Sequence, residues 1–294
     1  MSTGGLCFFE LIVFLLLFLI PCYSLTLPAF VFLLFSAMTN TLLIGAHGKV
    51  SLHLIPLLLS NSAQQLIAIV RASTQFADLI SAAGAPYEAR LHPKVHSLED
   101  ITSPAAASEL LSSYNAETVI FSAGAGGKGG PSKTFAIDQD ACIHFIEAAK
   151  VRKEVKRFIV VSYIGSRSKR APWWTDEDWN FTQESNNGVM KNYHKAKLAA
   201  DQVLLRANEE RGQGWGWSLR PGLLTDDEGG GVRMGKIGVS GSISRKVVAK
   251  VVREIAEKQG GKGGYVDFLG GDEDIELAVQ RVIREGIDCA EGED

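Results

Sequence analysis

The stretch that most constrains the fold spans residues 41–59, TLLIGAHGKVSLHLIPLLL. An apolar run at 42–44 leads into a glycine turn, and an apolar segment with helical spacing follows at once. This order builds the phosphate site of a doubly wound α/β fold, because glycine admits a pyrophosphate and the helix start offers free N–H groups to the anion. The spacing is G-x-x-G-x-x-S, with Ser51 in place of the third glycine of the usual fingerprint. We therefore predict a dinucleotide-phosphate loop, with an ordinary strand-to-helix turn as the alternative. Its expected cofactor-binding residues are Gly45, Ala46, His47, Gly48, Lys49 and Val50.

A second feature indicates which dinucleotide is bound. Arg71 ends the next apolar strand, expected over residues 65–71. Enzymes selective for NAD usually carry Asp or Glu here to accept hydrogen bonds from the ribose hydroxyls, whereas an arginine favours the 2′-phosphate of NADP. We expect NADP(H) as the cofactor, with Arg71 and Ser73 among its ligands. A solvated arginine at a strand end is the alternative.

Strands and helices alternate along the chain, which predicts a parallel sheet covered on both faces. Further strands are expected at 87–91, 117–122, 156–163, 215–219 and 265–269, and further helices at 73–83, 104–114, 133–151, 189–210, 244–258 and 275–285. Neither an internal repeat nor a second core is evident. The predicted fold class is therefore α/β, a single Rossmann-type doubly wound parallel sheet of about six to seven strands spanning residues 38–294.

Two loops are expected at the carboxyl edge of this sheet, where ligands bind in such folds. The glycine-rich loop at 124–130 follows the fourth strand, so Ala123 and Gly124 should lie beside the first loop; a surface linker is the alternative. The polar segment at 165–187 carries Trp173, Trp174 and Trp179. We expect these tryptophans to anchor the segment to the domain, with a lid over an aromatic substrate as the alternative.

Tyr193 and Lys197 form the pattern Y-x-x-x-K and share one face of a predicted helix. A lysine ammonium lowers the pKa of a neighbouring phenol, and the tyrosine can then pass a proton to a carbonyl as a hydride arrives. Ser162, at the end of the fifth strand, is the candidate for orienting the reacting oxygen. A chance pair is the alternative, but the helix follows the fifth strand, where such a pair belongs in this fold.

Residues 1–37 differ from the rest of the chain. Residues 11–46 carry no charge, and the apolar segments 6–20 and 25–37 flank Pro21. A membrane span needs roughly 20 apolar residues. Three interpretations are open: a membrane anchor through residues 6–37, a cleaved signal, or a gene-model extension ahead of Met38. We expect a cytoplasmic domain, either membrane-anchored by this segment or fully soluble if translation starts at Met38.

Composition argues against several classes of protein. The 294 residues are 46% apolar and carry a net charge of −3, so neither nucleic acid nor acidic lipid is indicated as a partner. The four cysteines are widely separated and no histidines pair like metal ligands, which indicates no disulfide framework and no metal, and fits a reducing compartment. The expected partner is a small-molecule substrate, and no oligomeric state is predicted.

Together these motifs resemble the atypical short-chain dehydrogenase/reductase superfamily, in its NAD(P)-binding, NmrA-like and biliverdin/flavin-reductase-like branch. The resemblance covers residues 41 to about 280. It rests on LLIGAHGKV (42–50), IAIVRAS (67–73), VIFSAGAGGKGG (119–130), AIDQDACIHFIEAAK (136–150), KRFIVVSYIGSR (156–167), YHKAKLAAD (193–201), WSLRPGLLTDDEGGG (217–231) and ISRKVVAKVV (243–252). It implies a Rossmann sheet of about seven strands with NADP across the strand tips. It also implies that Pro221 and Gly222 bind the nicotinamide end of the cofactor.

Three functions are compatible with these patterns. The leading hypothesis is an NADPH-dependent oxidoreductase acting on a small carbonyl, quinone or flavin-like acceptor, with Tyr193 as proton donor and Lys197 as its partner. A non-catalytic NADP(H)-binding sensor comes second, favoured by Ser51 and by the long interval between Ser162 and Tyr193. A nucleotide-sugar epimerase or dehydratase comes third, because such enzymes usually need a larger C-terminal substrate domain than the part of this chain after Pro221 provides.

Overall fold

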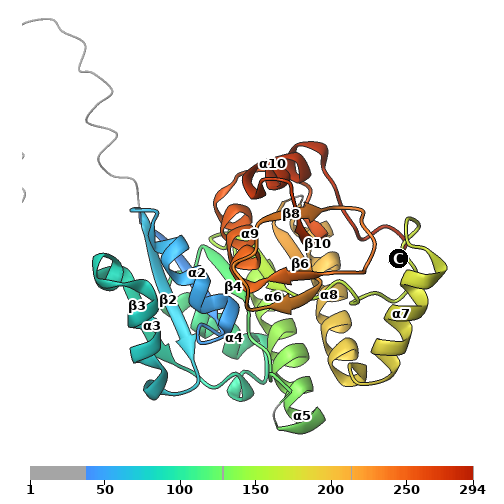
Figure 1. Cartoon of the computed structure of the whole chain (residues 1–294). Helices are drawn as coiled ribbons and strands as arrows, with labels where there is room; N and C mark the ends of the chain where they lie inside the picture. Colours follow the sequence, from blue (N-terminus) through green and yellow to red (C-terminus); the bar gives the residue numbers. More distant parts are fainter. Residues whose placement is uncertain (1–37, 128, 213, 294) are drawn as a thin grey trace, which may run out of the picture. The chain divides into compact units, whose positions relative to one another are not determined.

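The strands of the sheet run in an order that reverses once. The computed structural model describes residues 38–127, 129–212 and 214–293. Among these residues, one sheet has the order β3-β2-β1-β4-β5-β6-β10-β8, parallel except for β8 (Figure 1). The strands are β1 Thr39–Ile44, β2 Gln64–Val70, β3 Leu91–Val95, β4 Thr118–Phe121, β5 Arg157–Val161, β6 Gly216–Pro221, β8 Gly231–Met234 and β10 Gly264–Gly271. The predicted doubly wound parallel sheet is confirmed, and antiparallel β8 extends it by one unpredicted edge strand.

Helices cover both faces of the sheet (Figure 1). One face packs against α2 Lys49–Leu59, α3 Phe76–Ala83, α9 Arg245–Glu257 and α10 Ile275–Glu285. The other packs against α4 Pro104–Ser113, α6 Cys142–Lys150 and α8 Lys191–Arg211. Because successive strand residues point to opposite faces, Leu43 joins the first buried cluster while Leu42 and Ile44 join the second.

The helix expected over residues 133–151 starts earlier and is not uniform. It comprises α5 Gly130–Thr134, a π-helical stretch η5 Phe135–Ala141 and then α6. A π-helical turn places an extra residue in the helix and occurs frequently at functional sites. This irregularity lies directly after the glycine-rich loop, so it bears on the site described below.

The third strand was expected at 87–91, and this prediction is wrong. The 3₁₀ helix η3 Ala85–Arg90 occupies most of that stretch, with Pro86 in its first turn, and β3 begins only at Leu91. Strand β3 contains Pro93, which lacks a backbone N–H. An edge strand tolerates proline because one side of it has no neighbour to pair with, and β3 is at the edge of the sheet.

The polar segment after β5 contains a helix that was not predicted, α7 Asp176–Asn187. A capping box starts it: Thr175 Oγ1 accepts a hydrogen bond from Asp178 N, and the Asp178 carboxylate accepts one from Thr175 N. Trp173 and Trp174 both donate their indole N–H to the carbonyl of Ile237, at 3.1 and 2.9 Å. The tryptophans thus anchor the segment to the domain.

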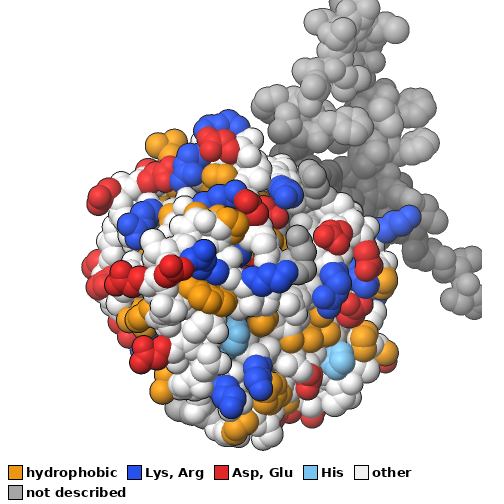
Figure 2. Space-filling model, turned by 90° about the vertical axis from the view of Figure 1, so that its right-hand side faces the viewer, with side chains coloured by type: hydrophobic (Ala, Val, Ile, Leu, Met, Phe, Trp, Pro, Cys, Tyr) orange, Lys and Arg blue, Asp and Glu red, His pale blue; other side chains and the backbone are white. Residues whose placement is uncertain are grey.

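A small parallel sheet of β7 Leu223–Thr225 and β9 Ser242–Ser244 follows the carboxyl end of β6. On the face drawn in Figure 2, basic and acidic side chains are interspersed rather than gathered by sign. The anchor, signal or extension expected for residues 1–37 lies outside the described residues. Within the described ranges, no helix combines the length and the apolar character needed to cross a membrane.

Candidate functional site

The sheet reverses its order between β1 and β4, and the candidate site is built there. Ile44 and Phe121 are paired at the ends of these strands, so the two following loops are neighbours. Ligands bind at such a reversal, outside the carboxyl ends of the strands. A Cβ built on Gly45 would lie 2.5 Å from Ala123 Cα, and Gly45 has a φ of +82°. Only glycine combines that backbone conformation with so close an approach.

The first turn of α2 is open to an anion. Gly48 caps the helix without a side-chain hydrogen bond, and the first turn carries no acidic residue. The first N–H groups of a helix have no partner inside it, and the helix dipole favours negative charge there. Ala46 and Val50 are buried beneath the loop, and Ser51 is fully buried, as a small residue packed between helix and strand must be. These features fit the pyrophosphate of a dinucleotide.

Lys49 connects this loop to a second one. Its Nζ lies 2.7 Å from Asp226 Oδ2, and Arg245 Nη1 lies 2.6 Å from the other oxygen of the same carboxylate. Asp226 follows β7, so the loop between β7 and β8 lies against the first turn of α2. Lys49 and Asp226 are both well exposed, at 67% and 60% of the side chain. This ion pair therefore lies at the mouth of the phosphate loop.

The predicted 2′-phosphate residues lie beyond the other end of the loop. His47 is held between Gln75 and Asp78, with 2.8 Å from Nδ1 to the Gln75 amide nitrogen and 2.7 Å from Nε2 to Asp78 Oδ2. Gln75 Oε1 accepts a hydrogen bond from Arg71 N. The Arg71 side chain is exposed after β2, and exposed Ser73 opens the 3₁₀ turn η2 Ser73–Gln75. One corner of the carboxyl edge of the sheet thus holds His47, Arg71 and Ser73.

Asp138 fixes the glycine-rich loop. Its Oδ2 accepts a hydrogen bond from Ala125 N at 2.9 Å, and a Cβ on Gly124 would meet Oδ1 at 2.7 Å. Asp138 is buried in η5, and burial raises the pKa of its carboxyl, opposed by Lys197 and the Ala125 N–H. No role was predicted for Asp138 from the sequence, although it lies within the segment 136–150 that carries part of the family resemblance. Gly124 is therefore needed for packing against Asp138.

Tyr193 and Lys197 lie together on α8, as their spacing requires. Lys197 is 1% exposed, and its Nζ donates a hydrogen bond to the carbonyl of Val161 at 2.8 Å. Burial lowers the pKa of Lys197, but the neighbouring acidic groups outweigh this and leave it raised, so the ammonium is charged. Burial also raises the pKa of Tyr193, and Lys197 opposes this only in part. The phenol is therefore protonated at neutral pH.

The hydroxyl of Ser162 is bound to a buried carboxylate. Its Oγ donates to Asp201 Oδ2 at 2.5 Å, and Asp201 also accepts hydrogen bonds from Ser166 Oγ (2.6 Å) and Ser218 Oγ (2.8 Å). Asp201 is fully buried. The carboxylate therefore ties the segment after β5 to β6 and engages the Ser162 hydroxyl. Asp201 was not predicted, because only the folded chain brings three serines to one carboxylate.

The expected nicotinamide end is held by a buried ion pair. Arg220 Nε lies 2.8 Å from Asp267 Oδ1, and both side chains are fully buried. The same guanidinium donates to the carbonyls of Ser166 and Ile164, at 3.0 and 3.2 Å. Burial raises the pKa of Asp267 to about 6, opposed by Arg220. Pro221 and Gly222 come next in the chain; both are buried, and a Cβ on Gly222 would lie 2.1 Å from Leu269 Cδ2.

A second buried arginine ties the segment after β5 to a distant part of the chain. Arg167 donates to the carbonyls of Cys289 and Glu291, at 2.6 and 2.8 Å. Its Nε lies 3.3 Å from Glu293, whose carboxylate also accepts hydrogen bonds from Ser168. Residues 289–293 thus hold the start of the segment that carries α7.

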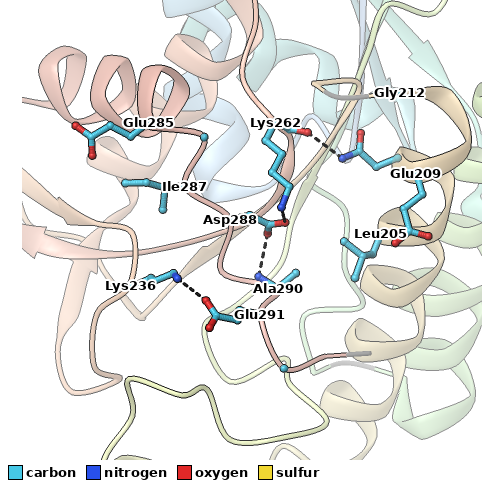
Figure 3. A pocket seen from close by; sticks show the side chains of 13 residues that line it. Leu205, Glu209, Gly212, Lys236, Lys262, Glu285, Ile287, Asp288, Ala290 and Glu291 are labelled. Atoms are coloured by element: carbon cyan, nitrogen blue, oxygen red, sulfur yellow. Dashed lines mark hydrogen bonds and ion pairs between the residues drawn. The ribbon is translucent and has the colours of Figure 1, made fainter.

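A cavity lies away from these residues. It has a volume of about 820 Å³ and is lined by α8, residues 285–292 and two lysines (Figure 3). Lys236 pairs with Glu291, and Lys262 lies 3.3 Å from Asp288, so both ammonium groups are already neutralised. A second cavity of about 360 Å³ lies beside β7 and β9. In the described chain, none of the predicted site residues lines either cavity.

Comparison with known proteins decides the family. Residues 45–259 match the model of a family described as NAD(P)H-binding. The chain belongs to this family. A UPF0659 protein of Schizosaccharomyces pombe is 31% identical over 254 residues, 85% of this chain and 97% of the relative. The uncharacterized sugar epimerase YhfK of Bacillus subtilis is 33% identical over 241 residues, 82% of this chain and 98% of the relative.

Solved structures agree with this assignment. A protein of Bacillus halodurans described as an NAD-dependent epimerase/dehydratase superposes with a TM-score of 0.65 at 28% identity, over 83% of this chain and 99% of the other. The oxidoreductase YlbE of Lactococcus lactis gives a TM-score of 0.62 at 21% identity, over 84% and 97%, and so shares the fold. The expected NAD(P)-binding Rossmann family is confirmed, and members bind a nicotinamide dinucleotide.

Proposed function

We propose that this protein is an NADPH-dependent oxidoreductase that reduces a small carbonyl, quinone or flavin-like acceptor. The observation that carries this proposal is the buried Lys197, one helical turn from Tyr193 on α8, with its ammonium hydrogen-bonded to the Val161 carbonyl. A reduction needs a proton donor that is protonated before the hydride arrives, and burial keeps Tyr193 in that state. The ammonium of Lys197 then stabilises the phenolate that proton transfer leaves behind.

Each part of the site has a role in this reaction. The bound dinucleotide supplies the hydride. The open turn of α2 receives the pyrophosphate, and Pro221 and Gly222 face the nicotinamide end. Tyr193 donates its proton to the oxygen of the acceptor. A hydrogen bond to the Val161 carbonyl fixes the ammonium of Lys197, one turn of helix from Tyr193.

The proposed preference for NADP(H) rests on charge. Arg71 places an exposed guanidinium after β2, and His47 lies at the same corner. The nearest carboxylate in this group, on Asp78, is engaged by His47 at 2.7 Å. A 2′-phosphate is dianionic and is favoured by such a group, whereas the bare ribose of NAD gains nothing from Arg71.

Oxidation of NADPH tests the proposal directly. The purified full chain is mixed with NADPH and a panel of carbonyls, quinones and flavins, and absorbance at the reduced nicotinamide is followed. We expect turnover with at least one class, lost in Tyr193→Phe with the dissociation constant for NADPH unchanged. Binding of NADPH without turnover on the whole panel would support a non-catalytic sensor instead.

A sugar epimerase is the second candidate, because a relative at 33% identity bears that name. The chain covers 98% of that relative, so the short C-terminal part does not argue against this function. However, epimerisation through a keto intermediate begins with removal of a proton from a hydroxyl, which a protonated Tyr193 disfavours. Interconversion of nucleotide sugars without net consumption of NADPH, followed by NMR, would favour the epimerase.

A further inference from the structure

A second tyrosine lies against the candidate proton donor. Tyr163 follows Ser162 directly, and its ring centroid is 5.1 Å from that of Tyr193 at an interplanar angle of 47°. Strand residues alternate in direction, so as the chain leaves β5 the Ser162 hydroxyl turns inward to Asp201 while Tyr163 faces α8. The side chain that packs against the Tyr193 ring is therefore that of Tyr163 and not that of Ser162.

The hydroxyl of Tyr163 is held at both sides. It donates to Asn186 Oδ1 at 2.8 Å, and Asn186 Nδ2 donates to the Gly165 carbonyl at 2.8 Å, which fixes the orientation of the amide. His194 Nδ1 lies 2.9 Å from the same hydroxyl. A phenol has one hydrogen, and here it is directed at Asn186. His194 must therefore supply its own hydrogen from Nδ1.

This arrangement requires two further features of the chain. A Cβ on Gly165 would lie 2.7 Å from Tyr163 Cε2, so the ring can fold over this position only because residue 165 is glycine. Asn186 is buried near the end of α7. The segment after β5 therefore supplies Asn186, which holds Tyr163, in addition to the tryptophans that anchor the segment.

We propose that Tyr163, held by Asn186 and His194, is the positioning residue that orients Tyr193. This rests on the proposed function for its kinetic consequence, but not for its geometry. The donor chain runs from His194 Nδ1 to Tyr163, to Asn186 and to the Gly165 carbonyl. Neutral histidine in water favours hydrogen on Nε2, so the Nδ1–H tautomer of His194 is a specific signature of this chain.

Nearby charges bear on the titration of these groups. The titratable groups that face His194 are Tyr163 and Glu293. Those that face Tyr163 are Tyr193, Asp201, Arg220 and His194. Burial lowers the pKa of His194, opposed by Glu293 and the Gly165 carbonyl, and burial raises the pKa of Tyr163. Both side chains are therefore neutral at pH 7.5, where the tautomer can be read.

The first experiment needs no turnover. Long-range ¹H–¹⁵N correlation spectra of the histidine-labelled full chain at pH 7.5 report the tautomer, with His194→Gln assigning the signal. We expect Nδ1–H in the wild type and a shift towards Nε2–H in Tyr163→Phe. The matched control is Tyr114→Phe, which removes a phenol 2.8 Å from His96 and should leave His194 unchanged. An Nε2–H tautomer in the wild type, or no response to Tyr163→Phe, overturns the proposal.

The second experiment measures kinetics with the acceptor found for the wild type. Tyr163→Phe should lower kcat at least tenfold and shift the alkaline limb of its pH profile, with the NADPH dissociation constant unchanged. Gly165→Ala should lower kcat and shift the pH profile in the same way, because the new Cβ displaces the Tyr163 ring. Ser162→Ala should lower kcat less than threefold and leave the pH profile unchanged. A large loss in Ser162→Ala with none in Tyr163→Phe overturns the proposal. If the wild type turns over no acceptor, the proposed function fails, and the tautomer still decides this inference.

Discussion

Gly45 and Ala123 lie in the loops that follow the neighbouring strands β1 and β4, so close together that a Cβ on the glycine would lie 2.5 Å from Ala123 Cα. We predict that Gly45→Ala lowers the free energy of unfolding by about 3 kcal/mol, since strained backbone and steric clash add, and abolishes NADPH binding. Gly127→Ala is the matched control, because Gly127 also has positive φ but nothing within 4 Å of its Cβ. In urea denaturation, Gly127→Ala should lose only the free energy of the backbone strain, about 1–2 kcal/mol. Equal losses for the two variants would contradict the packing argument.

The pairing of Lys49 with Asp226 competes with a bound phosphate. Asp226→Asn frees Lys49 and Arg245 for the pyrophosphate, so we expect tighter NADPH binding. Exposed ion pairs contribute about 0–1 kcal/mol, which limits the gain to about fivefold at low salt. Isothermal titration against Glu228→Gln, whose partner is Lys246 in the same region, separates this effect from a general loss of negative charge. Weaker binding by Asp226→Asn would mean that the carboxylate helps to form the site.

Arg71 should discriminate between the two dinucleotides. We expect Arg71→Ala to weaken NADPH binding about tenfold, or ~1.4 kcal/mol, with little change for NADH, because only NADPH carries the 2′-phosphate. Fluorescence titration of both cofactors measures this ratio. Arg284→Ala, an exposed arginine on α10, should leave both dissociation constants unchanged. Parallel losses for NADPH and NADH would rule out the 2′-phosphate role.

Asp267 makes stability depend on pH in an unusual direction. Its folded-state pKa of about 6 lies above the ordinary value of 3.8, so the folded protein keeps a proton that the unfolded chain releases. The bound proton adds up to about 3 kcal/mol to the free energy of unfolding below pH 3.8. This stabilisation is lost as the pH rises to about 6. We therefore expect the wild type to lose stability relative to Asp267→Asn across this interval. Urea denaturation of both proteins at several pH values measures the difference, and a wild type that gains on the variant as pH rises would refute it.

The phosphate loop was readable because its signal is local. An apolar run, two glycines and an amphipathic helix specify β1, the turn and α2 within twenty residues, and the parallel sheet follows from the same alternation. The strands that were missed, β7, β8 and β9, have three or four residues each and lie in glycine-rich sequence. So short a segment shows no periodicity. Strand β8 forms by pairing with β10, and β7 and β9 form by pairing with each other.

Helix α7 was missed for another reason. It carries no clear apolar face, but the Thr175–Asp178 capping box was present in the sequence and would have indicated a start. The buried acids Asp138 and Asp201 gave no such signal, because their partners come from other elements. Ser162 and Tyr163 are consecutive, so a shift of one residue decides which side chain lies beside Tyr193. The sequence alone does not resolve such a shift.

The enclosure of Arg167 has a consequence for how the protein matures. Its carbonyl partners at Cys289 and Glu291 are 122 and 124 positions further along the chain. During synthesis this guanidinium lacks these two carbonyl acceptors until Cys289 and Glu291 have left the ribosome, on the order of ten seconds later at about 5–20 residues per second. The phosphate loop can form early, but the segment that holds Tyr163 and α7 gains these hydrogen bonds only after residues 289–291 have been made. The start of the segment after β5 is therefore fixed later during synthesis than the phosphate loop.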